Sequence, residues 1–186
     1  MPTKVASALI IFIFGLSMGA ATLAKAEESS VPARSNIAEL FGLPLNDLSV
    51  SRLEKQLNSM GMHSYPSYKD GVVSYSLGPE GILGVTSATI YSNGSGYVRQ
   101  ALLSGVVESS EKRKALGELL ARKYGKPSEG FLNNGIGRSK WLFQDGTMIE
   151  LHNTTYDVSL MYVDENPKVA TRSGQIDVEA LSRKNQ

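Results

Sequence analysis

The chain contains no cysteine among its 186 residues. This absence excludes disulfide bonds, thiolate metal sites, a cysteine nucleophile and lipid attachment through an N-terminal cysteine of a mature protein. Small exported eukaryotic domains often depend on disulfides, whereas about 160 residues can bury an adequate core without them. If the chain is exported, we therefore expect a bacterial periplasm as its compartment.

An excess of charge of either sign is also missing. The chain has 19 Lys and Arg residues and 18 Asp and Glu residues. The leader described next carries two of the basic residues, Lys4 and Lys25, so 17 remain against 18 acidic ones. A nearly neutral chain without a basic block has no electrostatic footprint for nucleic acid or anionic lipid, so we expect neither as a partner.

Long apolar runs are absent except near the N-terminus. Lys4, the apolar run 5–16 and the triplet Ala24-Lys25-Ala26 have the pattern of a secretory signal peptide, with cleavage after Ala26. The alternative is a retained membrane anchor, which needs about 20 apolar residues. This run is shorter, and glycine and serine dilute its end. Residues 1–26 are therefore predicted to be a signal peptide, and we expect a periplasmic or secreted product without stable membrane insertion.

The clearest structural element is a helix over 109–124. Ser109 or Ser110 can cap its first turn, Gly125 supplies a left-handed end, and Pro127 prevents continuation. Its apolar stripe consists of Leu116, Leu119, Leu120 and Tyr124. A similar pattern predicts a helix over 49–60 that ends at Gly61.

Three strand candidates follow each helix. Alternating patterns and turn residues predict strands over 72–77, 85–91 and 97–106, and then over 139–143, 147–152 and 157–163. The segment 130–137, which is rich in Gly and Asn, is predicted to be a loop.

This order predicts the α+β class: two successive α-β-β-β units, with an antiparallel sheet and helices packed on one face. We place the domain at 47–164, divided into 47–107 and 108–164. Residues 27–46 are predicted to be a flexible N-terminal lead, and 165–186 a polar, disordered tail. Internal duplication and a chance repetition of the pattern both remain open.

The helix ends Leu57-Asn58-Ser59-Met60-Gly61 and Ala121-Arg122-Lys123-Tyr124-Gly125-Lys126-Pro127, with the hairpins after them, suggest a relationship of topology. Over about 49–164 the pattern resembles the β-lactamase inhibitory proteins and, more distantly, the outer-membrane assembly proteins of the BamE type. The resemblance includes no specific motif. The chain lacks the cysteines of those inhibitors and the lipidated cysteine of the assembly proteins, so no functional residue is carried over.

Three motif matches are better explained by structure than by chemistry. Gly15-Leu16-Ser17-Met18-Gly19 fits the nucleophile elbow of hydrolases but lies within the leader. Ser109-Ser110-Glu111-Lys112 has the serine-lysine spacing of penicillin-binding enzymes, yet the partner motifs are missing and helix capping explains it. The glycines and cations of 135–140 could hold a phosphate, but the segment precedes a strand, whereas a dinucleotide loop precedes a helix.

The chain has two histidines, His63 and His152. His152 shares one strand face with Glu150, so these residues could form an acid/base pair or hold a metal together. A metal site needs a third or fourth ligand, and none is obvious. A solvated strand face is the favoured interpretation, with no metal or cofactor. A small envelope hydrolase or lyase that uses His152 with Glu150 or Asp157 remains an alternative.

Aromatic residues provide the better indication of function. Tyrosine and tryptophan often anchor protein interfaces, although packing within the half-buried strands is the favoured explanation for these residues taken together. The candidate binding residues are Tyr75, Tyr91, Tyr97, Trp141 and Tyr156. The leading hypothesis is a non-enzymatic periplasmic module that binds another envelope protein as an inhibitor, an immunity-type factor or an assembly accessory. A carrier with a small-ligand cavity between helices and sheet is a further alternative.

Overall fold

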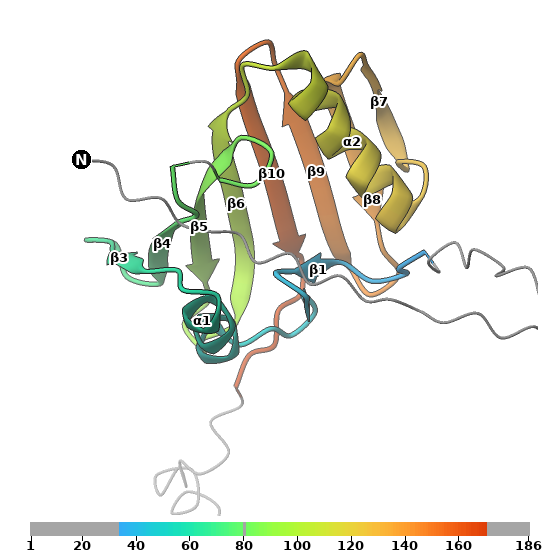
Figure 1. Ribbon diagram of the computed structural model, residues 1–186. Coiled ribbons are helices and arrows are strands. Elements are labelled where there is room, and N and C mark those ends of the chain that lie inside the picture. Colours follow the sequence, from blue (N-terminus) through green and yellow to red (C-terminus); the bar gives the residue numbers. More distant parts are fainter. Residues whose placement is uncertain (1–33, 80, 171–186) are drawn as a thin grey trace, which may run out of the picture. The chain divides into compact units, whose positions relative to one another are not determined.

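The structure is a computed structural model that describes residues 34–79 and 81–170 (Figure 1). The predicted signal peptide and residues 171–186 lie outside the described residues. The described part contains two helices and a large antiparallel sheet, which confirms the α+β class. Neither helix is long and apolar enough to cross a bilayer.

Both predicted helices are present, and a serine caps the first turn of each. In α1 (Val50–Ser59), the Ser49 hydroxyl accepts a hydrogen bond from the Arg52 N–H at 3.4 Å. In α2 (Ser110–Tyr124), the Ser109 hydroxyl accepts one from the Lys112 N–H at 3.3 Å. Gly125 ends α2 with a φ of 86°, which favours glycine.

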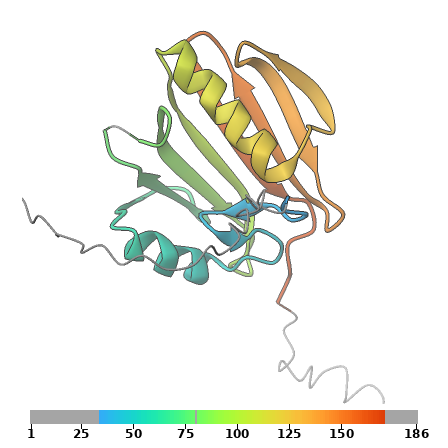
Figure 2. The same cartoon turned by 45° about the vertical axis from the view of Figure 1, so that its right-hand side comes forward.

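The main sheet has eight strands in the order β3-β4-β5-β6-β10-β9-β8-β7, and every neighbouring pair is antiparallel. The strands are β3 (Ser64–Pro66), β4 (Val72–Ser76), β5 (Val85–Ser92), β6 (Val98–Val106), β7 (Glu129–Asn133), β8 (Ile136–Leu142), β9 (Thr147–Asn153) and β10 (Asp157–Asp164). A separate hairpin pairs β1 (Glu39–Leu40) with β2 (Leu43–Pro44). Figures 1 and 2 show α2 running across one face of the sheet, over β8 and β9.

The edge strands β3 and β7 were not predicted. Most of β7 lies within 130–137, which the composition suggested to be a loop. The structure shows a two-residue hairpin turn there: Asn134 and Gly135 have φ values of 49° and 80°. Consecutive left-handed residues are typical of a type I′ turn, and Asn-Gly is its preferred sequence. The glycine and asparagine therefore indicate a tight hairpin at this position.

The expected boundaries of the domain also need correction. Leu40 and Leu45, within the expected flexible lead, are fully buried in the core. Ser35 is attached as well, since its N–H donates to the Lys123 carbonyl at 2.8 Å. At the other end, the Lys168 N–H donates to Asp47 Oδ1 at 2.8 Å. The folded domain thus includes the hairpin before α1 and the first residues of the expected tail.

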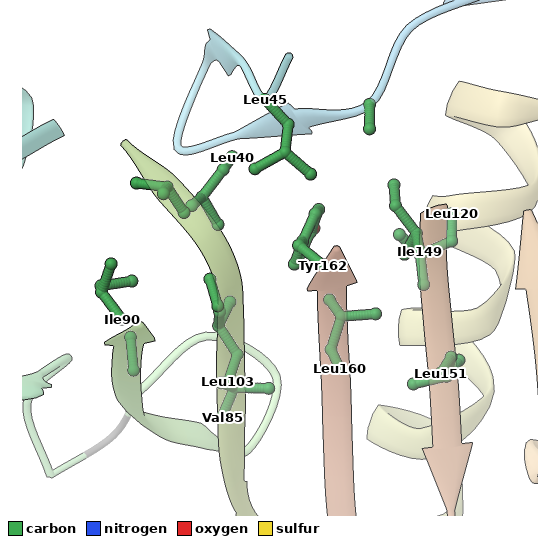
Figure 3. Close-up of a cluster of buried hydrophobic side chains, with 14 of the residues drawn as sticks. Leu40, Leu45, Val85, Ile90, Leu103, Leu120, Ile149, Leu151, Leu160 and Tyr162 are labelled. Carbon is green, nitrogen blue, oxygen red and sulfur yellow. The ribbon is translucent and has the colours of Figure 1, made fainter. Parts of the chain in front are cut away.

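The core lies on one face of the sheet, where alternate residues of β5, β6, β8, β9 and β10 are buried. Cross-strand register aligns two core rows: Val73-Ile90-Ala101-Tyr162-Ile149-Trp141 and Tyr75-Ala88-Leu103-Leu160-Leu151-Ser139. Figure 3 shows residues of these rows near Leu40 and Leu45 from the β1–β2 segment and Leu120 from α2. Ile149 and Leu151 are completely buried. The core thus joins the hairpin, α2 and the central strands.

Tyr162 gives the core a measurable dependence on alkaline pH. Burial, with a smaller contribution from Tyr124, raises the pKa of the Tyr162 hydroxyl above its ordinary value. Its contribution to stability is therefore complete below the unfolded-state pKa of about 10 and decreases as pH rises further. Between pH 9 and pH 11 this group should lower the free energy of unfolding by about 1.4 kcal/mol.

Urea denaturation at the two pH values checks this expectation. Tyr162→Phe should lose that part of the alkaline decrease, whereas Tyr156→Phe, at an exposed position, should behave like the unchanged chain. Equal decreases in all three proteins would contradict the assignment.

Candidate functional site: the open face of the sheet

The face of the sheet opposite the core consists of three cross-strand rows. They are Val72-Tyr91-Gln100-Val163-Met148-Leu142, Ser74-Thr89-Leu102-Met161-Glu150-Lys140, and Ser76-Ser87-Ser104-Ser159-His152-Arg138. Every one of these residues is half-buried or exposed. We call this surface the open face.

Apolar side chains are concentrated in the first two rows. Tyr91, Val163, Met148 and Leu142 lie in the first row, and Leu102 and Met161 face each other across β6 and β10 in the second. Leu142 is 51% exposed, although it is a leucine within a regular strand. These six residues form an apolar strip that crosses the sheet from β5 to β8. Their half-exposure leaves apolar area that a bound partner could remove from water.

Ion pairs border the apolar strip on β8 and β9. The Glu150 side chain is only 13% exposed and lies 3.3 Å from Arg138 Nε and 3.7 Å from Lys140 Nζ. Lys140 also lies 3.8 Å from Glu129 on the edge strand. Glu150 is therefore engaged by two cations on β8, which leaves His152 without the carboxylate partner suggested by their spacing.

On β4, β5 and β6, hydroxyl groups of the open face bond to one another across neighbouring strands. Ser74 Oγ lies 3.1 Å from Thr89 Oγ1, and Ser87 Oγ lies 3.0 Å from Ser104 Oγ. Such cross-strand pairs contribute to sheet stability. These strands thus present hydroxyl groups that are bonded to one another beside Tyr91 and Leu102 of the apolar strip.

His152 lies in a shallow depression of about 480 Å³, whose lining includes Ser104, Asp157 and Ser159. Ser159 is directly opposite His152 in the β9–β10 register. Within residues 34–79 and 81–170, no hydrogen bond joins His152 to Ser159 or Asp157. The same residues contain no group of three or more His, Asp or Glu side chains that could hold a metal ion. The depression therefore collects polar groups without arranging a proton relay.

Two of the predicted binding residues belong to the core. Tyr75 is 2% exposed and Trp141 is 3% exposed, and both lie in the core rows. The Trp141 Nε1–H donates to the Gly125 carbonyl at 2.9 Å, at the end of α2. The core gives the indole ring its apolar surroundings, and the Gly125 carbonyl gives its N–H a hydrogen-bond acceptor. Neither ring is available on the open face.

The other three predicted residues do not form one platform. Tyr91 lies on the open face, in the first row. Tyr97 precedes β6, with Lys168 Nζ 6.0 Å from its ring centre. Tyr156 is 66% exposed in the turn before β10, beside the opposite end of β6. The length of β6 separates Tyr97 from Tyr156 by about 30 Å. The structure thus places only Tyr91 within the candidate site.

Residues of the apolar strip other than Tyr91 were missed at the sequence level. A signal was present in β8, where Arg138 and Lys140 alternate with Ser139 and Trp141. Two charged residues on one parity indicate that the other parity faces the core. When the register is followed from β8 to β9 and then to β10, Met148 and Met161 lie on the same side as Arg138 and Lys140. They are therefore neighbours on the open face.

No protein-family model matches the chain, and comparisons with curated proteins and with solved structures found no significant match.

Proposed function

We propose that this protein is exported to the bacterial periplasm and binds another envelope protein through the open face, without catalysing a reaction. The observation that carries the proposal is the apolar strip from β5 to β8 on a sheet face whose residues are only half-buried. The signal-peptide pattern before Ala26 and the absence of cysteine support the compartment.

The composition of the open face favours a protein partner. Protein interfaces commonly combine an apolar centre with a polar rim, and the Glu150 ion pairs border the strip in this way. Met148 and Met161 contribute flexible side chains that can adapt to a partner surface. Small ligands usually occupy concave sites, whereas an extended sheet face suits another protein.

The topology supports a repeated architecture for this surface. α1 precedes β3 to β6 and α2 precedes β7 to β10, and the strand order of the second set mirrors that of the first. We propose that these are two related units, each with one helix on the core face and four strands, instead of the three expected from the sequence. They share one sheet through the β6–β10 pair. A topological relationship with β-lactamase inhibitory or BamE-type proteins remains part of this proposal.

The alternative of a hydrolase or lyase based on His152 has less support. It requires a carboxylate to orient the imidazole, and Glu150 is held by Arg138 and Lys140 instead. The loss of a binding partner on changing the apolar strip would therefore distinguish the two functions more clearly than a change at His152.

The proposal predicts that Met161→Asp abolishes partner retention. A carboxylate in the centre of a desolvated interface lacks a compensating cation, so we expect retention to fall at least about tenfold. The measurement is affinity capture from envelope extract with the chain that follows Ala26 as bait, and quantitative mass spectrometry of the retained proteins. Leu119→Asp, at an exposed position of α2, is the matched control.

The control should retain the same stoichiometric partner as the unchanged chain. If both variants retain it equally, the open face is not the binding surface. Thermal melting of each bait is the control for folding, and the Met161→Asp substitution on β10 should leave the domain folded.

A further inference from the structure

A separate pocket of about 360 Å³ lies between α2 and the β7–β8 hairpin. Its apolar lining includes Ala121, Pro127, Phe131, Leu132 and Trp141. This volume is near the lower end of the range of ligand pockets, about 300–1,000 Å³. Because Trp141 belongs to a core row, the pocket is on the side of the sheet opposite the open face. It is therefore independent of the proposed protein-binding surface.

The walls of the pocket are held in place by close contacts. A Cβ atom added to Gly117 of α2 would be 2.5 Å from Leu132 Cδ1, so the helix and the hairpin approach closely here and a larger residue would displace the leucine side chain. A Cβ atom at Gly135 would be 2.7 Å from the Lys114 backbone nitrogen. The hydrogen bond of Trp141 to the Gly125 carbonyl fixes the indole wall. These contacts indicate a pocket that is formed before a ligand binds.

One buried polar group in the lining has no partner within the described residues. Ser139 is 1% exposed, and its hydroxyl makes no hydrogen bond within the described part of the chain. Buried hydroxyl groups are normally bonded, since an unpaired one loses its hydration without compensation. Ser139 lines the pocket, and its hydroxyl is the buried polar group there that a ligand with a hydroxyl or carbonyl oxygen would satisfy.

The charges near the pocket balance. Lys114 and Glu118 are exposed, lie four residues apart on α2 and have opposite signs. They favour neither an anion nor a cation. We propose that this pocket binds a small uncharged molecule that has an apolar body and one hydroxyl or carbonyl oxygen, which bonds to Ser139.

Trp141 is the single tryptophan of the chain and lines the pocket, so its fluorescence reports directly on occupancy. A suitable probe is 4-bromobenzyl alcohol, because bromine quenches indole emission on contact. We expect saturable quenching in the full mature chain. Ala121→Phe should fill the pocket and weaken binding at least about tenfold. Arg122→Phe, at an exposed position next to it, should bind like the unchanged chain.

A second pair of measurements tests the role of Ser139. Ser139→Ala should weaken binding of 4-bromobenzyl alcohol about three- to tenfold, the range expected for one hydrogen bond. Binding of 4-bromotoluene, which lacks the hydroxyl, should remain unchanged in this variant. Non-saturable quenching of the unchanged chain, or equal binding by Ala121→Phe and Arg122→Phe, would overturn the proposal. Equal weakening of both probes by Ser139→Ala would overturn the assigned hydrogen bond.

Discussion

Replacing Trp141 by alanine should lower the free energy of unfolding by about 3–5 kcal/mol. The side chain is buried in a core row beside Ile149, so its removal leaves a cavity. It also removes the donor that satisfies the Gly125 carbonyl at the end of α2, and Gly125 itself is buried. Both effects act in the same direction, because a buried acceptor without a partner adds its own cost.

Urea denaturation checks this expectation, with Trp141→Phe as the matched variant. Phenylalanine retains most of the apolar volume but cannot donate, so we expect a decrease of about 1–2 kcal/mol. Trp141→Ala should still retain the protein partner at temperatures where it is folded, because the open face is unchanged. A stable Trp141→Ala protein that has lost its partner would instead return Trp141 to the binding surface.

Replacing Asp164 by alanine should cost about 2–4 kcal/mol of the free energy of unfolding. The residue is fully buried at the end of β10. Its Oδ2 accepts from the Asp47 N–H and its Oδ1 accepts from the Asn166 N–H, each at 3.0 Å. Asp47 in turn accepts from the Lys168 N–H at 2.8 Å. One carboxylate thus joins the loop before α1 to the residues after β10, and its loss leaves two donors without partners.

Asp164→Asn is the matched control, because its single carbonyl oxygen can replace only one of the two acceptors. We expect it to lose about half as much stability as alanine. Hydrogen exchange gives a local readout, since the amides of Asp47 and Asn166 should both exchange faster in Asp164→Ala, whereas only one of them should do so in Asp164→Asn. Unchanged protection of these amides in Asp164→Ala would show that the carboxylate does not hold the two segments together.

The sequence predicted the elements whose ends and periodicity agree. α2 has a serine cap, an apolar stripe and a glycine end, so local chemistry specified its limits within a residue. Not all of its stripe is buried: Leu116 and Leu120 are in the core, while Leu119 is exposed. The limits of a helix follow from nearby residues, whereas the burial of its sides depends on which elements pack against it.

The edge strand β7 and the β1–β2 hairpin were missed for a related reason. Glycine and asparagine around Gly130 and Asn134 suggested a loop, although Asn134-Gly135 is a hairpin signal. The short apolar segment containing Leu40 and Leu45 shows no period of its own and becomes ordered by burial against the strands. Composition alone does not distinguish such tertiary order from flexibility.

The candidate site depended on which side of each strand faces the core. In β4, Ser74 and Ser76 alternate with Tyr75. This alternation favours a buried tyrosine, although Tyr75 was predicted to be a binding residue. In β6, Leu102 and Leu103 are both apolar, so the pattern does not show which one faces the open side. Cross-strand register resolves this ambiguity by pairing Leu102 with Met161. That register connects residues about 60 positions apart, which no local pattern contains.

Site-specific photo-cross-linking in living cells tests the central claim most directly. A benzophenone amino acid placed at Met161 probes the middle of the open face, and the same group at Leu119 probes the exposed side of α2. Binding through the open face predicts one discrete cross-linked protein from position 161 and none from position 119. No product from position 161, or the same product from both positions, would contradict that account.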